Sequence, residues 1–127
     1  MRGLLDTSVL IDDEAPDELP DEIAISVASL AELHFGTHLA NDPAERRRRV
    51  RRLAVIEARF DPLPIDAEVA RAYGALADIV VRRGRNPRRR ALDLLIAATA
   101  QVHDVPLYTR DHADFAALSD EVELVLV

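Results

Sequence analysis

Short and almost wholly apolar segments recur along the chain and alternate with longer segments of helical periodicity. Apolar runs of this length are typical of parallel strands that are buried on both faces. They are expected at about residues 3–6, 23–25, 63–65, 105–109 and 123–127, with helices at 7–13, 26–39, 42–60, 66–83, 86–103 and 112–118. We therefore predict an α/β fold in three layers, with a parallel sheet of about five short strands flanked by helices, and a single domain over residues 1–127.

Capping residues support several of these helix boundaries. Ser26, Asp42 and Asp66 each precede a helical pattern and carry side-chain oxygens that accept hydrogen bonds from the first free amides of a helix. Pro43 follows Asp42 at the first helical position, where a missing N–H costs nothing. Gly84 is expected to end the helix that begins after Asp66.

The composition excludes several kinds of chemistry. The 127 residues include 16 arginines and 23 acidic residues, but no cysteine and no lysine. A disulfide framework, a thiol nucleophile, a Schiff base and the lysine of a phosphate-binding loop are therefore all absent. The carboxylates remain, and their hard oxygens suit Mg²⁺ or Mn²⁺. No apolar run is long enough to span a membrane and the N-terminal segment is too short for a signal peptide, so we expect a cytoplasmic protein.

Four acids stand where a carboxylate needs an explanation. Asp6 ends the first strand, Asp111 follows the strand at 105–109, and Glu32 and Asp93 lie among apolar residues of two helices. The carboxyl ends of neighbouring parallel strands meet at one edge of a sheet, so Asp6 and Asp111 are expected to meet there. Each acid alone has an ordinary explanation as a cap, a turn or a helix edge, and for Asp93 as a surface ion pair with Arg89 or Arg90 at i−4 and i−3.

Convergence of these acids would be costly without a cation. Two unit charges 5 Å apart repel by about 3 kcal/mol at an effective dielectric constant of 20. Either some of the four acids bind protons, or a divalent ion balances their charge. A metal ion in such a site lowers the pKa of a bound water and stabilises charge on a phosphoryl oxygen. The pattern therefore indicates phosphodiester hydrolysis.

The sequence around each of the four acids resembles the PIN-domain ribonucleases. The matching segments are Leu4-Leu-Asp6-Thr-Ser-Val-Leu-Ile11, Ser29-Leu-Ala-Glu32-Leu, Ala91-Leu-Asp93-Leu-Leu-Ile-Ala-Ala and Leu107-Tyr-Thr109-Arg-Asp111-His-Ala-Asp114-Phe115. They occur in order over essentially the whole chain, and the resemblance is strongest to the VapC-type toxins of toxin–antitoxin modules.

This resemblance implies a PIN-like fold and cleavage of RNA that depends on Mg²⁺ or Mn²⁺. It makes Asp6 and Asp93 the principal metal ligands, with Glu32 and Asp111 completing the acidic cluster, and Glu32 is alternatively the base that activates water. The hydroxyls of Thr7, Ser8 and Thr109 would orient these carboxylates. Asp114 is a further candidate acid beside Asp111. The resemblance also implies a homodimer and an antitoxin peptide bound near the helix at 42–60.

Twelve of the 16 arginines fall in two runs, at 46–52 and 82–90. Arg88, Arg89 and Arg90 lie just before Asp93, so we interpret them as candidates for binding RNA phosphates, with a solvent-exposed helix face as the alternative. His34 and His38 have the spacing of paired metal ligands on a helix but lack a third ligand nearby, so an exposed helix face is the favoured interpretation.

Two other functions remain open at this point. One is a housekeeping nuclease of the same fold that matures RNA, and the other is a non-catalytic interaction module that retains the acids. The complete set of four acids disfavours the second alternative. The identity of the RNA target cannot be read from any motif.

Overall fold

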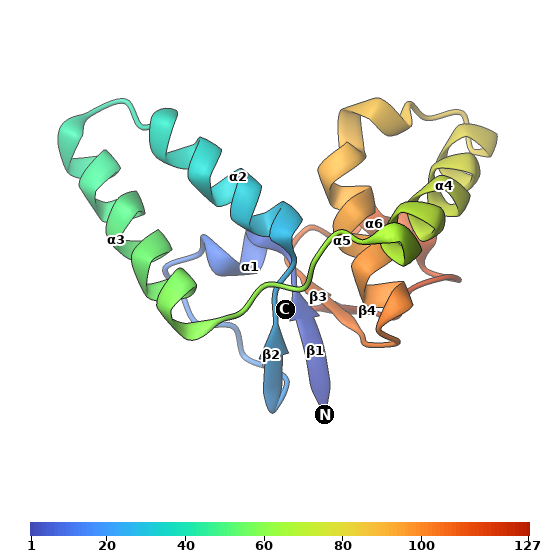
Figure 1. Ribbon diagram of the computed structural model, residues 1–127, viewed down its shortest axis with the longest axis horizontal. Coiled ribbons are helices and arrows are strands. Elements are labelled where there is room, and N and C mark those ends of the chain that lie inside the picture. Colours follow the sequence, from blue (N-terminus) through green and yellow to red (C-terminus); the bar gives the residue numbers. More distant parts are fainter.

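The computed structural model of residues 1–127 contains a four-stranded parallel sheet (Figure 1). The strand order is β2-β1-β3-β4, so β1 and β3 occupy the centre. The strands are β1 (Arg2–Leu5), β2 (Glu22–Ala24), β3 (Leu107–Thr109) and β4 (Leu124–Leu126). The parallel sheet with helices around it confirms the predicted α/β fold class.

The strand expected at residues 63–65 is reduced to a single parallel bridge. Leu63 donates its amide to the carbonyl of Ile25 at 2.8 Å and accepts from the amide of Val27 at 3.0 Å. Pro62 and Pro64 lie on either side of Leu63 and have no amide hydrogen. Pairing therefore cannot extend beyond one residue, and the sheet has four regular strands with Leu63 beyond its β2 edge.

The helices follow the predicted order with local differences at their ends. They are α1 (Thr7–Leu10), α2 (Val27–His38), α3 (Pro43–Arg59), α4 (Ala67–Arg82), α5 (Ala91–Val102) and α6 (His112–Phe115), with 3-10 helices η1 (Pro87–Arg90) and η2 (Ala116–Leu118). The single helix expected at 86–103 is η1 followed by α5, and the one expected at 112–118 is α6 followed by η2. The first helix ends at Leu10, before the acidic loop, rather than at residue 13.

The predicted caps are confirmed. The side chains of Ser26, Asp42 and Asp66 accept hydrogen bonds from backbone amides in the first turns of α2, α3 and α4, at 2.8 to 3.0 Å. Gly84 follows α4 with φ of +76°, a left-handed conformation that glycine adopts without strain. The local sequence therefore sets where these helices begin and where α4 ends.

Two clusters of buried side chains divide the molecule into a larger and a smaller lobe. The larger cluster joins the sheet to α4 and α5 and includes Leu4, Val69 and Ile96, which are fully buried. A smaller cluster holds α2 against α3 through Leu33, Leu53 and Ile56, together with Ile25. In Figure 1 the α2–α3 pair and the α4–α5 pair rise as two arms on either side of the carboxyl end of β1. No helix is both long and apolar enough to cross a membrane.

Candidate active site

Asp6 lies at the centre of the carboxyl edge of the sheet. It follows β1 directly, caps α1, and is only 3% exposed. Oδ1 accepts a hydrogen bond from the amide of Thr7 at 2.8 Å, while Oδ2 accepts from Ser8 Oγ at 2.7 Å and Thr109 Oγ1 at 2.9 Å. Three donors therefore hold both carboxylate oxygens in one orientation, as expected for a ligand whose position matters.

The hydroxyls that hold Asp6 also join the ends of β1 and β3. Thr109 Oγ1 accepts from the amide of Asp111 at 2.9 Å, and Ser8 Oγ accepts from the amide of Arg110 at 3.1 Å. Thr109 is fully buried, so its hydroxyl is fixed by the protein rather than by solvent. Thr7, Ser8 and Thr109 thus each donate a hydroxyl hydrogen bond to a carboxylate of the candidate site.

Glu32 reaches the same place from α2. Its Oε1 accepts a hydrogen bond from Thr7 Oγ1 at 2.7 Å, which links α2 to the residue that follows Asp6. Burial raises the pKa of Glu32, and the negative charge of Asp6 raises it further, while the Thr7 hydrogen bond opposes both effects. The electrostatic influence of Asp6 shows that the two carboxylates share one site.

Asp93 enters the site from the first turn of α5. Burial is the largest cause that raises the pKa of Asp93, to about 7, and the charges of Asp6, Glu32 and Asp114 add to it. Arg90 acts in the opposite direction. Asp93 therefore sits among like charges, and near neutral pH its protonated and ionised forms are both populated.

Asp111 and Asp114 form the outer part of the cluster. Hydrogen bonding with the Asp114 carboxyl is the main cause that raises the pKa of Asp111, followed by burial and by the charges of Asp114 and Asp6. The Arg90 guanidinium forms an ion pair with Asp114, with Nη1 at 2.9 Å from Oδ1, and Nη1 donates a hydrogen bond to the Asp114 carbonyl at 2.8 Å. Asp6 and Asp111 thus lie close enough to interact, as the neighbouring strands predict.

The position of Arg90 differs from the simplest interpretation of the sequence. The RNA-binding roles of Arg88, Arg89 and Arg90 stay predictions, but the sequence spacing also predicts a helical ion pair of Asp93 with Arg89 or Arg90. Instead Arg90 binds Asp114 and supplies the positive charge nearest to the acids, while Arg88 and Arg89 are exposed and have no carboxylate partner. The fold of the Asp111–Asp114 segment decides this pairing, and no local spacing signals it.

The residues fit a divalent cation by the chemistry of their donors. No three acidic or histidine side chains lie close enough together to ligate one metal ion directly. Mg²⁺ does not require such a group, since it is usually held by one or two carboxylates and keeps several waters. Asp6 supplies an oriented carboxylate and Asp93 supplies one whose ionised form is disfavoured by its neighbours. A cation between them would relieve that repulsion.

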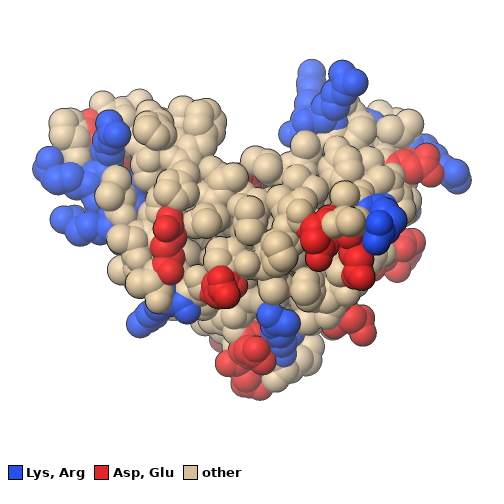
Figure 2. Space-filling view, viewed as in Figure 1, with Lys and Arg blue, Asp and Glu red and all other residues tan.

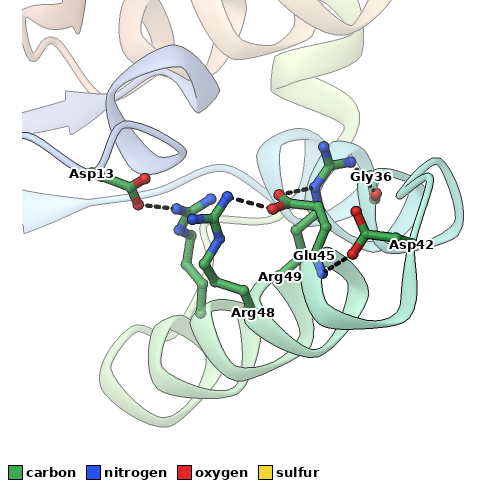
Figure 3. A network of polar contacts seen from close by, with 7 residues as sticks. Asp13, Gly36, Asp42, Glu45, Arg48 and Arg49 are labelled. Atoms are coloured by element: carbon green, nitrogen blue, oxygen red, sulfur yellow. Dashed lines mark hydrogen bonds and ion pairs between the residues drawn. The ribbon is translucent and has the colours of Figure 1, made fainter.

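A cleft of about 720 Å³ runs from Thr7 and Glu32 along α2 and α3. Its apolar wall includes Phe35 and Leu39, which are 63% and 57% exposed. Its charged wall is drawn in Figure 3: Glu45 pairs with Arg48 and Arg49, and the amide of Glu45 donates to Asp42.

The remaining contacts of this wall hold α3 in place. Arg49 Nη1 donates to the carbonyl of Gly36 at 2.7 Å, and Arg52 pairs with Asp13. His34 pairs with Glu57 across α2 and α3 at 2.5 Å, while His38 is exposed, in agreement with the interpretation of both as surface residues. Each arginine that faces the cleft is therefore already paired with an acid, and Arg48 and Arg49 share Glu45. The sequence alone shows the helices but not the cleft, because its walls come from separate elements.

Comparison with known proteins gives one family model and several close relatives. The model described as the PIN domain matches residues 3–121. The chain is 38% identical to Ribonuclease VapC5 of Mycobacterium tuberculosis, with 98% of this chain and 93% of the relative aligned. It is 37% identical to Ribonuclease VapC8 of the same species, over 79% of this chain and 91% of the relative.

A solved structure of high similarity is the crystal structure of VapBC-5 from M. tuberculosis, a member of the VapBC family of toxin–antitoxin systems. The TM-score is 0.88 at 37% identity, and the match covers 99% of this chain and 98% of the other. The similarity therefore extends over both arms and the carboxyl edge of the sheet.

Proposed function

Because this chain belongs to the PIN domain family, we propose that it is an endoribonuclease and the toxin of a toxin–antitoxin module. The observation that carries the proposal is the meeting of Asp6, Glu32 and Asp93 at one edge of the sheet. They come from β1, α2 and α5, in a chain that is 38% identical to a ribonuclease over nearly its full length.

Asp6 and Asp93 are the residues that would hold a divalent cation, Mg²⁺ or Mn²⁺, with Glu32 and Asp111 completing the acidic surroundings. Such a cation lowers the pKa of a water and stabilises charge on the phosphoryl oxygens of RNA. The protein fixes Asp6 through Thr7, Ser8 and Thr109, so that this carboxylate need not reorganise on binding.

The chain also offers an acceptor for the proton of an attacking water. Glu32 Oε1 is engaged by Thr7 Oγ1, which leaves Oε2 without a protein partner. Burial and the charge of Asp6 raise the pKa of Glu32, and a raised pKa makes a carboxylate a stronger base. Glu32 therefore takes up a proton of the water at Oε2 while the water oxygen attacks phosphorus in line. The bond from phosphorus to the 3′-oxygen breaks, and the leaving 3′-oxygen takes a proton from solvent, which yields a 5′-phosphate and a 3′-hydroxyl.

The test compares RNA cleavage by the wild type with that by Asp6→Asn in the presence of Mg²⁺. The variant keeps the shape of the side chain but removes its charge, and cleavage is expected to fall by at least 100-fold, the scale of losing several kcal/mol of stabilisation. Asp61→Asn is a matched control because Asp61 is an exposed acid with no ion pair. Circular dichroism verifies folding, and undiminished cleavage by folded Asp6→Asn contradicts the proposal.

An antitoxin segment fits the cleft between α2 and α3. The related VapBC-5 structure belongs to a toxin–antitoxin family. In this chain, Phe35 and Leu39 expose large apolar surfaces beside a wall of paired charged side chains, which suits an amphipathic peptide. Glu32 also lines the cleft, so a bound segment would lie against this acid of the candidate site.

Phe35→Asp tests this placement by measuring complex formation with the antitoxin. Complex formation is expected to weaken at least tenfold, because a buried aromatic anchor is lost and a charge is left in an apolar contact. Val81→Asp is a control on α4, where Val81 is also more than half exposed. Equal binding by the Phe35 and Val81 variants would place the antitoxin elsewhere.

A further inference from the structure

The structure divides the 16 arginines into those with and without an acidic partner. Seven form ion pairs with carboxylates, among them Arg48, Arg49, Arg52 and Arg90. The other nine have no carboxylate within ion-pair distance, and all nine are exposed. This division cannot be read from the sequence, where paired and unpaired arginines stand next to one another.

Seven of the nine unpaired arginines gather in two clusters. The first cluster lies on α3, where Arg46, Arg47 and Arg51 surround the exposed Val50. The second cluster, around the turn from α4 into η1, consists of Arg83, Arg85, Arg88 and Arg89. Arginines at such spacing repel one another. Other arginines of the chain are paired with acids, but these seven are not.

The two clusters lie on different arms. The first is in the N-terminal half of α3, on the arm formed with α2, and the second is at the end of the arm formed by α4 and α5 (Figure 1). In Figure 2 basic side chains mark the outer edge of one lobe and the top of the other, on either side of a notch. Each arm contributes one acid of the candidate site, Glu32 from α2 and Asp93 from α5, and the charges of these two acids influence each other.

The carboxylate site itself has the wrong charge for holding RNA. Asp6, Glu32, Asp93, Asp111 and Asp114 bring five negative charges to the candidate site, Arg90 is the cation that acts on Asp93 and Asp111, and the whole chain has a net charge of −7. One divalent ion would balance only part of this charge. The affinity for a polyanion must therefore come from positive charge outside the site.

We propose that the two unpaired arginine clusters hold the phosphate backbone of the RNA on both sides of the carboxylate site, so that the substrate is an RNA large enough to reach both arms. This inference rests on the proposed ribonuclease function. Arginine suits the role because its planar guanidinium binds phosphate through two parallel hydrogen bonds. The RNA backbone does not bind along the α2–α3 cleft, because the arginines of the cleft are already paired with Glu45 and Asp13.

The test measures binding of a fluorescent stem-loop RNA as a function of salt, in EDTA so that no cleavage occurs. One variant replaces the α3 cluster (Arg46→Gln, Arg47→Gln, Arg51→Gln), and a second replaces the cluster at η1 (Arg83→Gln, Arg85→Gln, Arg88→Gln, Arg89→Gln). The control, Arg59→Gln with Arg71→Gln, removes two exposed unpaired arginines outside the clusters. Glutamine preserves the helix-forming character of these positions.

Each phosphate contact contributes roughly 0.7 to 0.9 to the slope of log K against log salt. We expect the magnitude of the slope to fall by about 2 to 3 in the α3 variant, by about 3 to 4 in the η1 variant, and by less than about 0.5 in the control. A short single-stranded RNA that reaches only one arm is expected to lose affinity in the η1 variant and to retain it in the α3 variant. An unchanged stem-loop slope in either cluster variant overturns the proposal, as does equal loss of the short RNA in both.

The same proteins separate this inference from the function on which it rests. If the wild type cleaves RNA with Mg²⁺ but both cluster variants keep its salt slope, the ribonuclease proposal stands and the clusters do not hold RNA. If the cluster variants lose the salt dependence of RNA binding but the wild type does not cleave RNA, the clusters hold RNA and the ribonuclease proposal is contradicted. Variants that keep RNA binding and lose only the antitoxin complex would assign the clusters to a protein interface and also overturn the proposal.

Discussion

Asp93→Asn is expected to stabilise the metal-free protein at pH 8 while abolishing its activity. In the folded chain, burial and the charges of Asp6 and Glu32 raise the pKa of Asp93 to about 7, against 3.8 for an ordinary aspartate. The difference of about three units corresponds to about 4 kcal/mol at 1.36 kcal/mol per unit. Asp93 is only about half buried, so solvent screening reduces this to on the order of 1–2 kcal/mol.

The sign of the effect follows from proton binding. The folded state binds the Asp93 proton more tightly than the unfolded state, so the wild type loses stability as the pH rises from about 4 to about 7. Asparagine carries no ionisable proton and does not lose stability in this way. The stabilisation by Asp93→Asn is therefore small near pH 4 and complete above pH 7.

Urea unfolding in EDTA at about pH 4.5 and about pH 8 measures the free energy of unfolding of the wild type and of the variant at each pH, from the midpoint and slope of each curve. Asp120→Asn is the control, because Asp120 is exposed and forms no ion pair. Mg²⁺ is then added at pH 8, where it is expected to raise the melting temperature of the wild type more than that of the variant. A variant that is no more stable than the wild type at pH 8, or equally stabilised at both pH values, refutes the view that Asp93 lies in a repulsive site.

Three further substitutions test the surroundings of the site. Thr109→Val removes a buried hydroxyl that donates to Asp6, and is expected to lower the free energy of unfolding by about 1–3 kcal/mol in urea titrations. Gly3→Ala places a Cβ 2.5 Å from Tyr108 Cε1, and the resulting overpacking is expected to lower the thermal midpoint, at a cost of about 1–3 kcal/mol. Arg90→Gln removes the cation that lowers the pKa of Asp93, so the acidic limb of the pH–rate profile is expected to move to higher pH. Arg90→Lys keeps the positive charge and is expected to move this limb less.

The parts of the site that follow from strand topology were predictable from sequence. Asp6 and Asp111 each follow a short apolar strand, and neighbouring parallel strands bring such residues to one edge. Glu32 and Asp93 stand out because a carboxylate within an apolar helical pattern needs a partner or a function. The roles of Asp6, Glu32, Asp93 and Asp111 as ligands or bases stay predictions until a metal-binding or activity measurement tests them.

The parts that depend on tertiary packing were not predictable. Nothing in the run from Arg82 to Arg90 distinguishes Arg90, which turns inward to Asp114, from Arg88 and Arg89, which stay in solvent. The same applies on α3, where Arg49 reaches the carbonyl of Gly36 in the preceding helix. Such choices depend on where separate elements lie in space, whereas caps and strand ends depend on a few neighbouring residues.

The net charge of −7 at first argues against a nucleic-acid partner, but the distribution of charge reverses that inference. Seven of the acids lie in the segment 12–22, and five more surround the candidate active site. An acidic site is needed to hold a divalent ion, yet it repels the phosphates on either side of the bond to be cut. Unpaired arginines on both arms resolve this conflict, because they attract the RNA backbone at positions where they do not neutralise the carboxylates. Because the arginines that bind the RNA backbone lie apart from the carboxylates that hold the metal ion, one small chain can bind RNA and cleave it.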